Sequence, residues 1–495
     1  MREKAYLAID IGASSGRHVA GLFNGGKLRL EEVFRFENGP VTAGGHLYWD
    51  VLRQWTHVKD GLRAAATKLD ATPVSVGVDT WGVDFGLLGH DDELLGYPVC
   101  YRDARTNGML DHAFGVVPRE EIFSQTGLQF MQINTLYQLL AMRLNKSPLL
   151  DVAESFLMMP DLFHWLLTGI KTNEFTNATT TQFFDPRKRT WAYPLLERLG
   201  LPTTLFRETT PPGSTLGPLL GSVASETGLG SVQVVTPGTH DTASAVLAVP
   251  FTGQSSAKPT WCYISSGTWS LMGVEVPGPV INDKCLSLNF TNEGGVGDTI
   301  RLLKNIGGLW LLQECRRVWN LAGKNYSWDD LTRMSSAAKP LASLIDPDAP
   351  EFLAPQNMPE AIRAFCQRTG QSVPGDEGAI LRCALDSLAL RYRQVLGWLE
   401  ELTGGHIETI HIVGGGAQNK QLSQAAADAC NRRVIAGPVE ATAVGNVLMQ
   451  AVAAGDITDI AQAREVVARS FGVETYEPRE TAKWDEAFER FKKLS

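Results

Sequence analysis

The sequence predicts an α/β protein built from two duplicated domains. Its 495 residues are too many for one hydrophobic core and suit two domains. A strand pattern, a turn of small residues and a second strand pattern run over residues 5–23, and the same order returns over 261–274. Residues 407–454 then follow the order of a βαβ unit. The repeated opening is the strongest of these indications of duplication.

The first domain is expected to begin with a hairpin. Buried strands are predicted at 5–10 and 17–23, joined by the small-residue turn at 12–16. An Asn-Gly-Gly turn at 24–26 and the alternating residues 28–33 predict a third strand. In a Rossmann or P-loop unit a helix would follow the glycine turn, so both of these folds are disfavoured.

The rest of the first domain is predicted from a helix, two strands and a second helix. Apolar residues at helical spacing predict a helix over 51–69, with Asp50 as its N-cap, before a buried strand at 74–78. Residues 231–236 are typical of a strand, and after a short loop the Ala-rich segment 241–249 is typical of a helix.

The second domain is expected after a linker rich in Gly, Ser and Pro at residues 253–259. Its hairpin turn is Ser265-Ser266-Gly267-Thr268, and its βαβ unit carries a triple-glycine loop before a helix that ends near Cys430. The predicted boundaries are 1–252 for the first domain and 260–455 for the second, with a helical extension over 456–495.

Composition excludes several classes of function. With 45 Lys and Arg against 54 Asp and Glu, the net charge of −9 disfavours binding to nucleic acid. The seven cysteines are scattered and odd in number, so we expect buried thiols in a reducing compartment, without a zinc site or a disulfide framework. No apolar run reaches the ~18 residues of a membrane span, and a cytoplasmic protein is expected.

The first small-residue turn has the chemistry of a phosphate-binding loop. In Asp10-Ile11-Gly12-Ala13-Ser14-Ser15-Gly16-Arg17, backbone amides and hydroxyls can approach phosphate oxygens, Arg17 adds positive charge, and Asp10 can hold a hydrated Mg²⁺. An ordinary hairpin with a surface arginine is the alternative interpretation. The matching turn at 265–268 favours the phosphate interpretation, because a nucleotide held between two lobes needs a loop from each.

Asp241 is the candidate acceptor of a proton during phosphoryl transfer. It follows a loop at the carboxyl end of a strand, where open α/β sheets place ligands. At a helix N-terminus its pKa is expected to be lowered, which suits a base at neutral pH. The alternative is an aspartate that only caps its helix. His240 and Thr242 beside it are expected either to bind a sugar hydroxyl or to cap the same helix.

Several separated stretches together resemble the carbohydrate kinases of the FGGY family, which belongs to the actin-like ATPase superfamily. The resemblance extends from Ala5 to about Gly455. It rests on residues 10–17, 79–84 (Asp-Thr-Trp-Gly-Val-Asp), 101–108, 176–182, 239–246 (Thr-His-Asp-Thr-Ala-Ser-Ala-Val), 265–273, 291–295 (Thr-Asn-Glu-Gly-Gly), 303–306 and 412–416. It implies two duplicated actin-like (ribonuclease H-like) domains with a central cleft between them.

The resemblance also implies roles for individual residues. ATP would be bound by Ala13, Ser14, Ser15, Gly16, Arg17, Thr268, Gln313 and Gly415, with Gly415 against adenosine and Asp10 organising Mg²⁺ through water. The ketose would be bound by Gly82, His240, Asp241, Thr242 and Asn305, with Asp241 as the proton acceptor. Asp84 and Asp103 are left outside this set, because nothing in their spacing places them at the sugar.

The implied reaction transfers the γ-phosphate of ATP to the C1 hydroxyl of L-rhamnulose, in the breakdown of L-rhamnose. One alternative is a kinase of a related ketose such as L-fuculose. Another is an actin-like ATPase that works as a binding or assembly protein. The expected partners are ATP and a ketose, with neither nucleic acid nor membrane; the sequence does not predict an oligomeric state.

Overall fold

The computed structural model describes residues 3–253 and 255–494 and divides into two compact units. Each unit collects several segments of the chain. Unit 1 contains Met1–Ser256, Glu275–Leu302 and Glu440–Phe471. Unit 2 contains Ala257–Val274, Leu303–Val439 and Gly472–Ser495. The first change of unit, after Ser256, falls inside the predicted linker, but a single cut there does not describe the units, because later segments return to unit 1.

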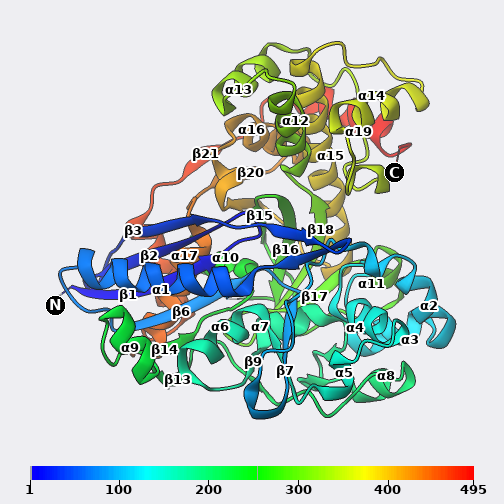
Figure 1. Ribbon diagram of the computed structural model, residues 1–495. Helices are drawn as coiled ribbons and strands as arrows, with labels where there is room; N and C mark the ends of the chain where they lie inside the picture. The colour runs from blue at the N-terminus through cyan, green and yellow to red at the C-terminus, as the bar shows by residue number, and fades with distance from the viewer. Residues whose placement is uncertain (1–2, 254, 495) are drawn as a thin grey trace. The chain divides into compact units, whose positions relative to one another are not determined.

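Unit 1 is centred on a six-stranded sheet of order β13-β14-β6-β1-β2-β3 (Figure 1). β1 pairs antiparallel with β2 and parallel with β6. The predicted strands at 5–10, 17–23, 28–33, 74–78 and 231–236 are therefore confirmed. The bounds of the six strands are β1 (Lys4–Ile11), β2 (Ser15–Phe23), β3 (Leu28–Glu37), β6 (Ser75–Thr80), β13 (Ser214–Pro218) and β14 (Gln233–Thr236).

The remaining elements of unit 1 surround this sheet. Short strands form four further pairs: β4 (Pro40–Ala43) with β5 (His46–Trp49), β7 (Phe85–Leu88) with β8 (Ser155–Met158), β9 (Asn173–Glu174) with β12 (Thr209–Thr210), and β10 (Phe184–Asp185) with β11 (Thr190–Trp191). The helices are α1 (Val51–Lys68), α2 (Met109–Val116), α3 (Arg119–Thr126), α4 (Thr135–Leu144), α5 (Leu149–Val152), α6 (Met159–Thr168), α7 (Phe175–Ala178), α8 (Tyr193–Arg198), α9 (Gly221–Thr227), α10 (Asp241–Leu247), α11 (Asp283–Ser287), α17 (Ala441–Ala453) and α18 (Ile460–Ser470).

Helices cover both faces of the β1–β3 part of the sheet. On one face, His18 of β2 bonds the carbonyl of Val58 in α1 over 3.1 Å, and Asp50 caps that helix by accepting from the amide of Arg53. On the other face a Cβ on Gly21 would lie 2.3 Å from Val447 of α17, so glycine allows the close approach of this helix. Figure 1 shows α1 and α17 on these opposite faces.

The late helix α17 is a structural part of unit 1. Its Asn446 donates to the carbonyl of Gly77, and its Gln450 donates to the carbonyl of Leu7, both over 3.1 Å. Ser75 donates to Gln450 over 2.7 Å. These buried bonds to β1 and β6 explain why residues 440–471 belong to unit 1 and not to the domain that precedes them in sequence.

Unit 2 repeats the strand plan of unit 1. The second sheet has the order β17-β18-β16-β15-β19-β20-β21, in which β15 pairs antiparallel with β16 and parallel with β19. The order β3-β2-β1-β6-β14-β13 thus corresponds, strand by strand, to β18-β16-β15-β19-β20-β21, which confirms the predicted duplication. The strands are β15 (Trp261–Ser266), β16 (Trp269–Val276), β17 (Thr291–Gly294, in unit 1), β18 (Ile300–Gly307), β19 (Thr409–Val413), β20 (Arg433–Ala436) and β21 (Glu474–Tyr476).

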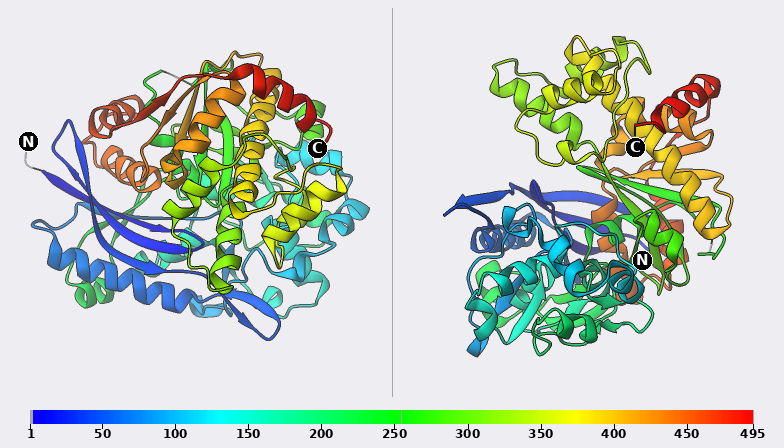
Figure 2. Two further views of the ribbon diagram at one scale, coloured as in Figure 1. Left: turned by 90° about the horizontal axis from the view of Figure 1, so that it is seen from above. Right: turned by 90° about the vertical axis from the view of Figure 1, so that its right-hand side faces the viewer.

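A long helix packs against the strands of unit 2. Tyr392 of α15 and Ser270 of β16 share a buried hydrogen bond of 2.7 Å, and Figure 2 shows α15 in yellow beside the green strands. The helices of this unit are α12 (Trp310–Leu321), α13 (Trp328–Ala337), α14 (Met358–Arg368), α15 (Glu377–Thr403), α16 (Lys420–Cys430) and α19 (Thr481–Phe491). None of the described helices in either unit is long and apolar enough to cross a membrane.

Candidate active site

The first small-residue turn lies between β1 and β2 and is closed by its own backbone. The amide of Gly12 donates to the carbonyl of Ser15 over 2.9 Å, and the side chain of Asn38 donates to the carbonyl of Gly12 over 2.8 Å. A Cβ on Gly16 would lie 2.1 Å from the ring of Phe36, so only glycine fits there. The turn is therefore a fixed shape and not a flexible loop.

Arg17 is paired with carboxylates at the base of this turn. Its Nε and Nη2 donate to Oδ2 of Asp10 over 3.0 and 2.8 Å, and Nη1 contacts Glu440. The side chain of Arg17 is 20% exposed and that of Asp10 is 10% exposed. Ser14, at the tip, is exposed. Ser14 at the tip is therefore open to a ligand, while the guanidinium of Arg17 is held by two acids.

Asp79 is a buried carboxylate that the sequence argument did not select. It is the register neighbour of Asp10 in the parallel β1–β6 pair. Asn446 donates to its Oδ2 over 2.5 Å, but Oδ1 is buried without a hydrogen-bond partner among the described residues. Burial, and next the charge of Asp10, raise the pKa of Asp79 well above its usual range. The signal available in the sequence was its place at the start of the 79–84 stretch, directly after the predicted strand at 74–78.

Asp241 begins α10 at the end of a loop that is fixed beside β6. The amide of Thr80 donates to the carbonyl of Thr239 over 2.9 Å. Oδ1 of Asp241 accepts from the hydroxyl of Thr242 over 3.0 Å and lies 3.5 Å from Nε2 of His240. The side chain is 32% exposed, and no described residue donates a hydrogen bond to Oδ2. One oxygen is thus engaged by neighbours and the other is free for a ligand.

The expectation of a lowered pKa for Asp241 is wrong. Burial by the surrounding protein raises this pKa; the charge of Asp10 adds to the effect, while His240 and the bonds with Thr242 oppose it. Helix α10 has only seven residues, so its dipole is small. The residues that bury Asp241, and the Asp10 carboxylate, come from other parts of the chain. A prediction from the helix terminus alone could not include them.

His240 lies between Asp241 and a buried ion pair. Nη2 of Arg301 is 3.1 Å from Nδ1 of His240 and 3.2 Å from Oε2 of Glu293, and that carboxylate oxygen is 3.3 Å from Nδ1. The Arg301 side chain is fully buried and those of Glu293 and His240 nearly so. Glu293 belongs to the Thr-Asn-Glu-Gly-Gly motif, to which the sequence argument gave no role.

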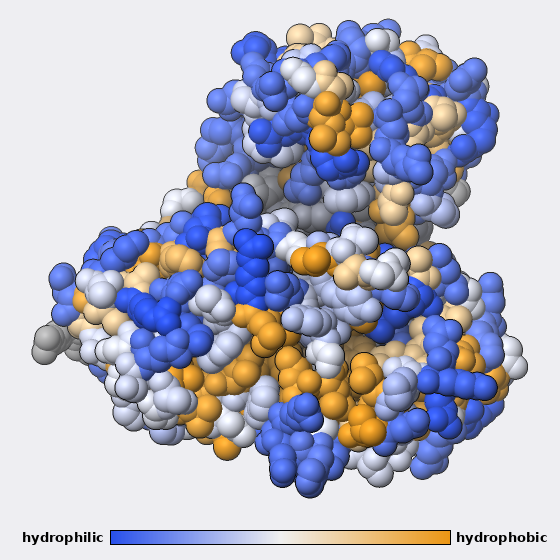
Figure 3. Space-filling model, in the orientation of Figure 1, coloured by the Kyte–Doolittle hydropathy of each residue, from blue (hydrophilic) through white to orange (hydrophobic). Residues whose placement is uncertain are grey.

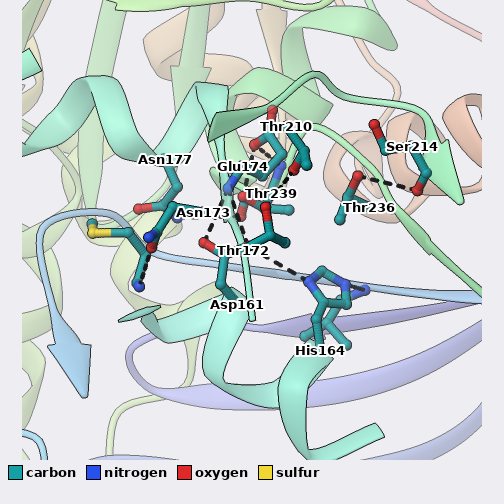
Figure 4. A network of polar contacts seen from close by, with 12 residues as sticks. Asp161, His164, Thr172, Asn173, Glu174, Asn177, Thr210, Ser214, Thr236 and Thr239 are labelled. Carbon is teal, nitrogen blue, oxygen red and sulfur yellow. Dashed lines mark hydrogen bonds and ion pairs between the residues drawn. The ribbon is translucent and has the colours of Figure 1, made fainter. Parts of the chain in front are cut away.

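A second buried carboxylate holds the backbone just before His240 (Figure 4). Oε2 of Glu174 accepts from the amide and hydroxyl of Thr239 over 2.9 and 2.7 Å, and Oε1 accepts from the amide of Thr176 over 2.9 Å. The hydroxyl of Thr176 accepts from the amide of His240 over 3.1 Å. Burial raises the pKa of Glu174 to about 7, although its hydrogen bonds act the other way. This network fixes the loop that carries His240 and Asp241.

The loop after β6 carries the predicted sugar contact Gly82. Its neighbour Val83 has φ of 69° and donates its amide to the hydroxyl of Thr180 over 3.0 Å. A Cβ on Gly82 would lie 3.0 Å from the same Thr180 side chain. The side chain of Asn177 bonds the carbonyls of Trp81 and Thr239 over 3.4 and 3.5 Å, which ties this loop to the one before Asp241.

Asp84 and Asp103 hold protein groups. Asp84 accepts from the indoles of Trp49 and Trp81 over 2.6 and 2.9 Å, and from the side chain of Gln138 over 2.9 Å. Burial raises the pKa of Asp84 to about 6 against these bonds. Asp103 accepts from two backbone amides and lies 3.2 Å from the ring of a histidine. Asp84 therefore supports the loop after β6, and Asp103 supports β5 and the start of the segment at Arg105.

The remaining predicted residues lie in unit 2. Thr268, at the β15–β16 turn, donates to Oε1 of Gln313 in α12 over 3.4 Å. Gly415 follows Gly414, whose φ is 85°, and a Cβ on Gly416 would lie 2.0 Å from Oγ of Ser266. The triple glycine thus packs against the strand that leads to Thr268. Asn305 lies in β18, partly exposed.

The predicted residues therefore fall into two sets, one in each unit. Unit 1 holds Asp10, Ala13, Ser14, Ser15, Gly16, Arg17, Gly82, His240, Asp241 and Thr242; unit 2 holds Thr268, Asn305, Gln313 and Gly415. Of the described residues, no group of three or more His, Cys, Asp or Glu side chains is arranged to hold a metal ion directly. All seven cysteines are buried and free of disulfides.

Known proteins are similar to this chain over almost its whole length. Residues 5–248 match the N-terminal domain of the FGGY family of carbohydrate kinases, and residues 262–454 match its C-terminal domain. The chain is 45% identical to a rhamnulokinase of Bacteroides thetaiotaomicron, covering 98% of both chains. It is 42% identical to a rhamnulokinase of Oceanobacillus iheyensis, covering 96% of this chain and 98% of the relative.

Solved structures agree on the fold. A xylulose kinase from Lactobacillus acidophilus has a TM-score of 0.81 at 16% identity, covering 99% of this chain and 97% of the other. A glycerol kinase from Plasmodium falciparum has a TM-score of 0.76 at 13% identity, covering 99% of this chain and 98% of the other. The predicted fold, two duplicated domains of the actin-like sugar-kinase type, is confirmed.

Proposed function

Because the chain belongs to the FGGY family of carbohydrate kinases, we propose that it transfers the γ-phosphate of ATP to the C1 hydroxyl of L-rhamnulose. The products are L-rhamnulose 1-phosphate and ADP. The observation that carries the mechanism is Asp241, whose Oδ2 is free of described donors at the end of a loop fixed by buried bonds. A cytoplasmic location and a part in L-rhamnose breakdown stay predictions of the sequence.

Asp241 acts in this proposal as the acceptor of the sugar proton. The C1 oxygen attacks the γ-phosphorus, the bond from that phosphorus to the bridging oxygen of ADP breaks, and the hydroxyl proton passes to the carboxylate. Thr242 and His240 lie at Oδ1. Oδ2 is therefore the oxygen that meets the substrate.

His240 positions Asp241 in this proposal. Its Nδ1 lies 3.1 Å from Nη2 of Arg301, which only donates, and 3.3 Å from Oε2 of Glu293, which only accepts, so Nδ1 has a partner in either protonation state. Its Nε2 lies 3.5 Å from Oδ1 of Asp241, which places the imidazole ring beside the carboxylate. Glu293 balances the charge of Arg301.

ATP is proposed to be bound by the turn at residues 13–17 and by Thr268, Gln313 and Gly415. Mg²⁺ would be held through water by Asp10, and when bound it would neutralise charge on the phosphates. The residues fit this ion, because Asp10 is the register neighbour of Asp79, whose Oδ1 is buried without a described hydrogen-bond partner, and hard oxygen ligands suit Mg²⁺. Gly82, His240, Thr242 and Asn305 are proposed to bind the ketose.

A coupled assay of ADP release with Mg·ATP tests the proposal. L-Rhamnulose, L-fuculose, xylulose, ribulose and glycerol are compared at equal concentrations. The greatest kcat/KM is expected with L-rhamnulose. A greater value with L-fuculose would assign the related ketose instead. ADP release that no ketose stimulates would reject the kinase in favour of an ATPase that drives binding or assembly.

A further inference from the structure

Unit 1 contains a cavity that the proposed reaction does not use. Its volume is about 440 Å³, within the range of small-molecule pockets. Residues of β5, of β7 with the loop after it, and of the end of α4 line the cavity. None of the residues proposed to bind ATP, Mg²⁺ or the ketose is among them.

Arg105, one of the residues that line this cavity, has no acidic ion-pair partner among the described residues. Nη2 of Arg105 donates to Oε1 of Gln138 over 2.8 Å, and its Nε is buried with no partner among the described residues. No described carboxylate oxygen lies within 4.0 Å of an Arg105 nitrogen, the distance that defines an ion pair. The acids whose charges act on Arg105, Asp84 and Asp103, accept hydrogen bonds from other donors. Arg105 thus brings to the lining of the cavity a charge that an anionic ligand can neutralise.

Much of the cavity lining is apolar. Leu87, Leu95, Met142 and Leu149 belong to it, and Tyr97, another lining residue, is 49% exposed. Figure 3 shows hydrophobic residues gathering at the lower centre of the face, in the part of unit 1 where Figure 1 draws β7. An exposed apolar surface beside an unneutralised guanidinium matches a ligand that is charged at one end only.

We propose that this cavity binds a small organic monoanion. Its acidic group would bind Arg105, and its apolar body would pack against the lining residues Leu87, Leu95, Met142 and Leu149. Asn145 and Ser147 also line the cavity and carry further hydrogen-bond donors. A dianion or a sugar phosphate fits less well, because one guanidinium is available and most of the lining cannot hydrogen-bond. The site is independent of the proposed kinase reaction.

Ligand-observed NMR titration of the intact chain tests the proposal, with 4-phenylbutyrate as probe and 4-phenylbutan-1-ol as its neutral match. The acid is expected to bind about 10- to 100-fold more tightly than the alcohol, as a hydrogen bond to a charged group implies. Arg105→Met should remove this preference. Equal affinity for the two compounds, or no saturable binding below about 10 mM, would overturn the proposal.

Two further variants separate binding from folding. Leu149→Trp keeps Arg105 but fills the cavity, so it should weaken binding of both compounds by about tenfold or more. Arg143→Met removes the same charge from an exposed residue of α4 that pairs with Asp151 and does not line the cavity. It should leave both affinities unchanged. Binding that survives both Arg105→Met and Leu149→Trp would place the probe elsewhere and reject the site.

Discussion

The proposed contact of Gly415 with adenosine can be tested without disturbing the protein. A Cβ on Gly415 would meet no atom within 4 Å, and its φ lies outside the left-handed region. In Gly415→Val the added carbons therefore enter open space. The free energy of unfolding should change by less than about 1 kcal/mol.

The effect on ATP is expected to be much larger. If adenosine lies against this glycine, the valine methyls take up its space, and overpacking of this kind costs about 1–3 kcal/mol. That range corresponds to a Kd for ATP about 5- to 150-fold higher. Calorimetric titration of ATP without ketose measures it, and the KM for the ketose should stay the same.

The neighbouring glycine supplies the matched control. A Cβ on Gly416 would lie 2.0 Å from Oγ of Ser266, so Gly416→Ala should lower stability by about 1–3 kcal/mol. Thermal unfolding of both variants separates a loss of fold from a loss of nucleotide contact. A folded Gly415→Val protein that binds ATP with the wild-type Kd would refute the assignment of Gly415.

Three other predictions concern buried or partly buried carboxylates. Asp241→Asn should lower kcat by about 10²–10⁴-fold while the Kd for ATP is unchanged, and near-normal turnover would contradict its role as proton acceptor. Glu174 has a pKa of about 7 in the folded protein against 4.5 ordinarily, so folding binds its proton and the free energy of unfolding falls as pH rises from 4.5 through 7, by roughly 3 kcal/mol. Glu174→Gln has no titrating group here, so its free energy of unfolding should not fall over this pH window as that of the wild type does. Denaturation at several pH values should therefore show the difference in stability between wild type and variant shrinking from pH 4.5 to 7, and a constant difference would disprove the linkage. Asp84→Asn should cost about 1–3 kcal/mol, because its amide cannot accept from Gln138 as the carboxylate does, and it should raise the KM for the ketose through the Trp81–Gly82 loop; an unchanged KM would show that Asp84 acts on stability alone.

Local sequence patterns were sufficient for the strands and the duplication. The small-residue turns at 12–16 and 265–268 and the alternation around them depend on neighbours in sequence, and the paired strands appear at those positions. The assignment of residues 440–471 to unit 1 could not be predicted from local patterns. It depends on hydrogen bonds from Asn446 and Gln450 to strands near the N-terminus of the chain.

The residues of the candidate site could be selected from the sequence only where one segment carries them. Asp241 and its neighbours were selected from the motif at 239–246, and the family resemblance supplied the roles proposed for them. The charged residues that support these neighbours could not be found in this way. Glu174 bonds Thr239, 65 residues further along the chain, and Arg301 is 61 residues from His240. The same long-range surroundings explain the wrong expectation for the pKa of Asp241.

Because α17 belongs to unit 1, this unit cannot be completed until late in translation. During synthesis the β1–β6 sheet leaves the ribosome first, yet Asp79 lacks its only described donor, Asn446, until almost the whole chain has emerged. The earliest segment is therefore completed by one of the last. A nascent chain must keep an apolar sheet face uncovered for most of translation, and truncation before residue 440 should yield a product that aggregates or is degraded.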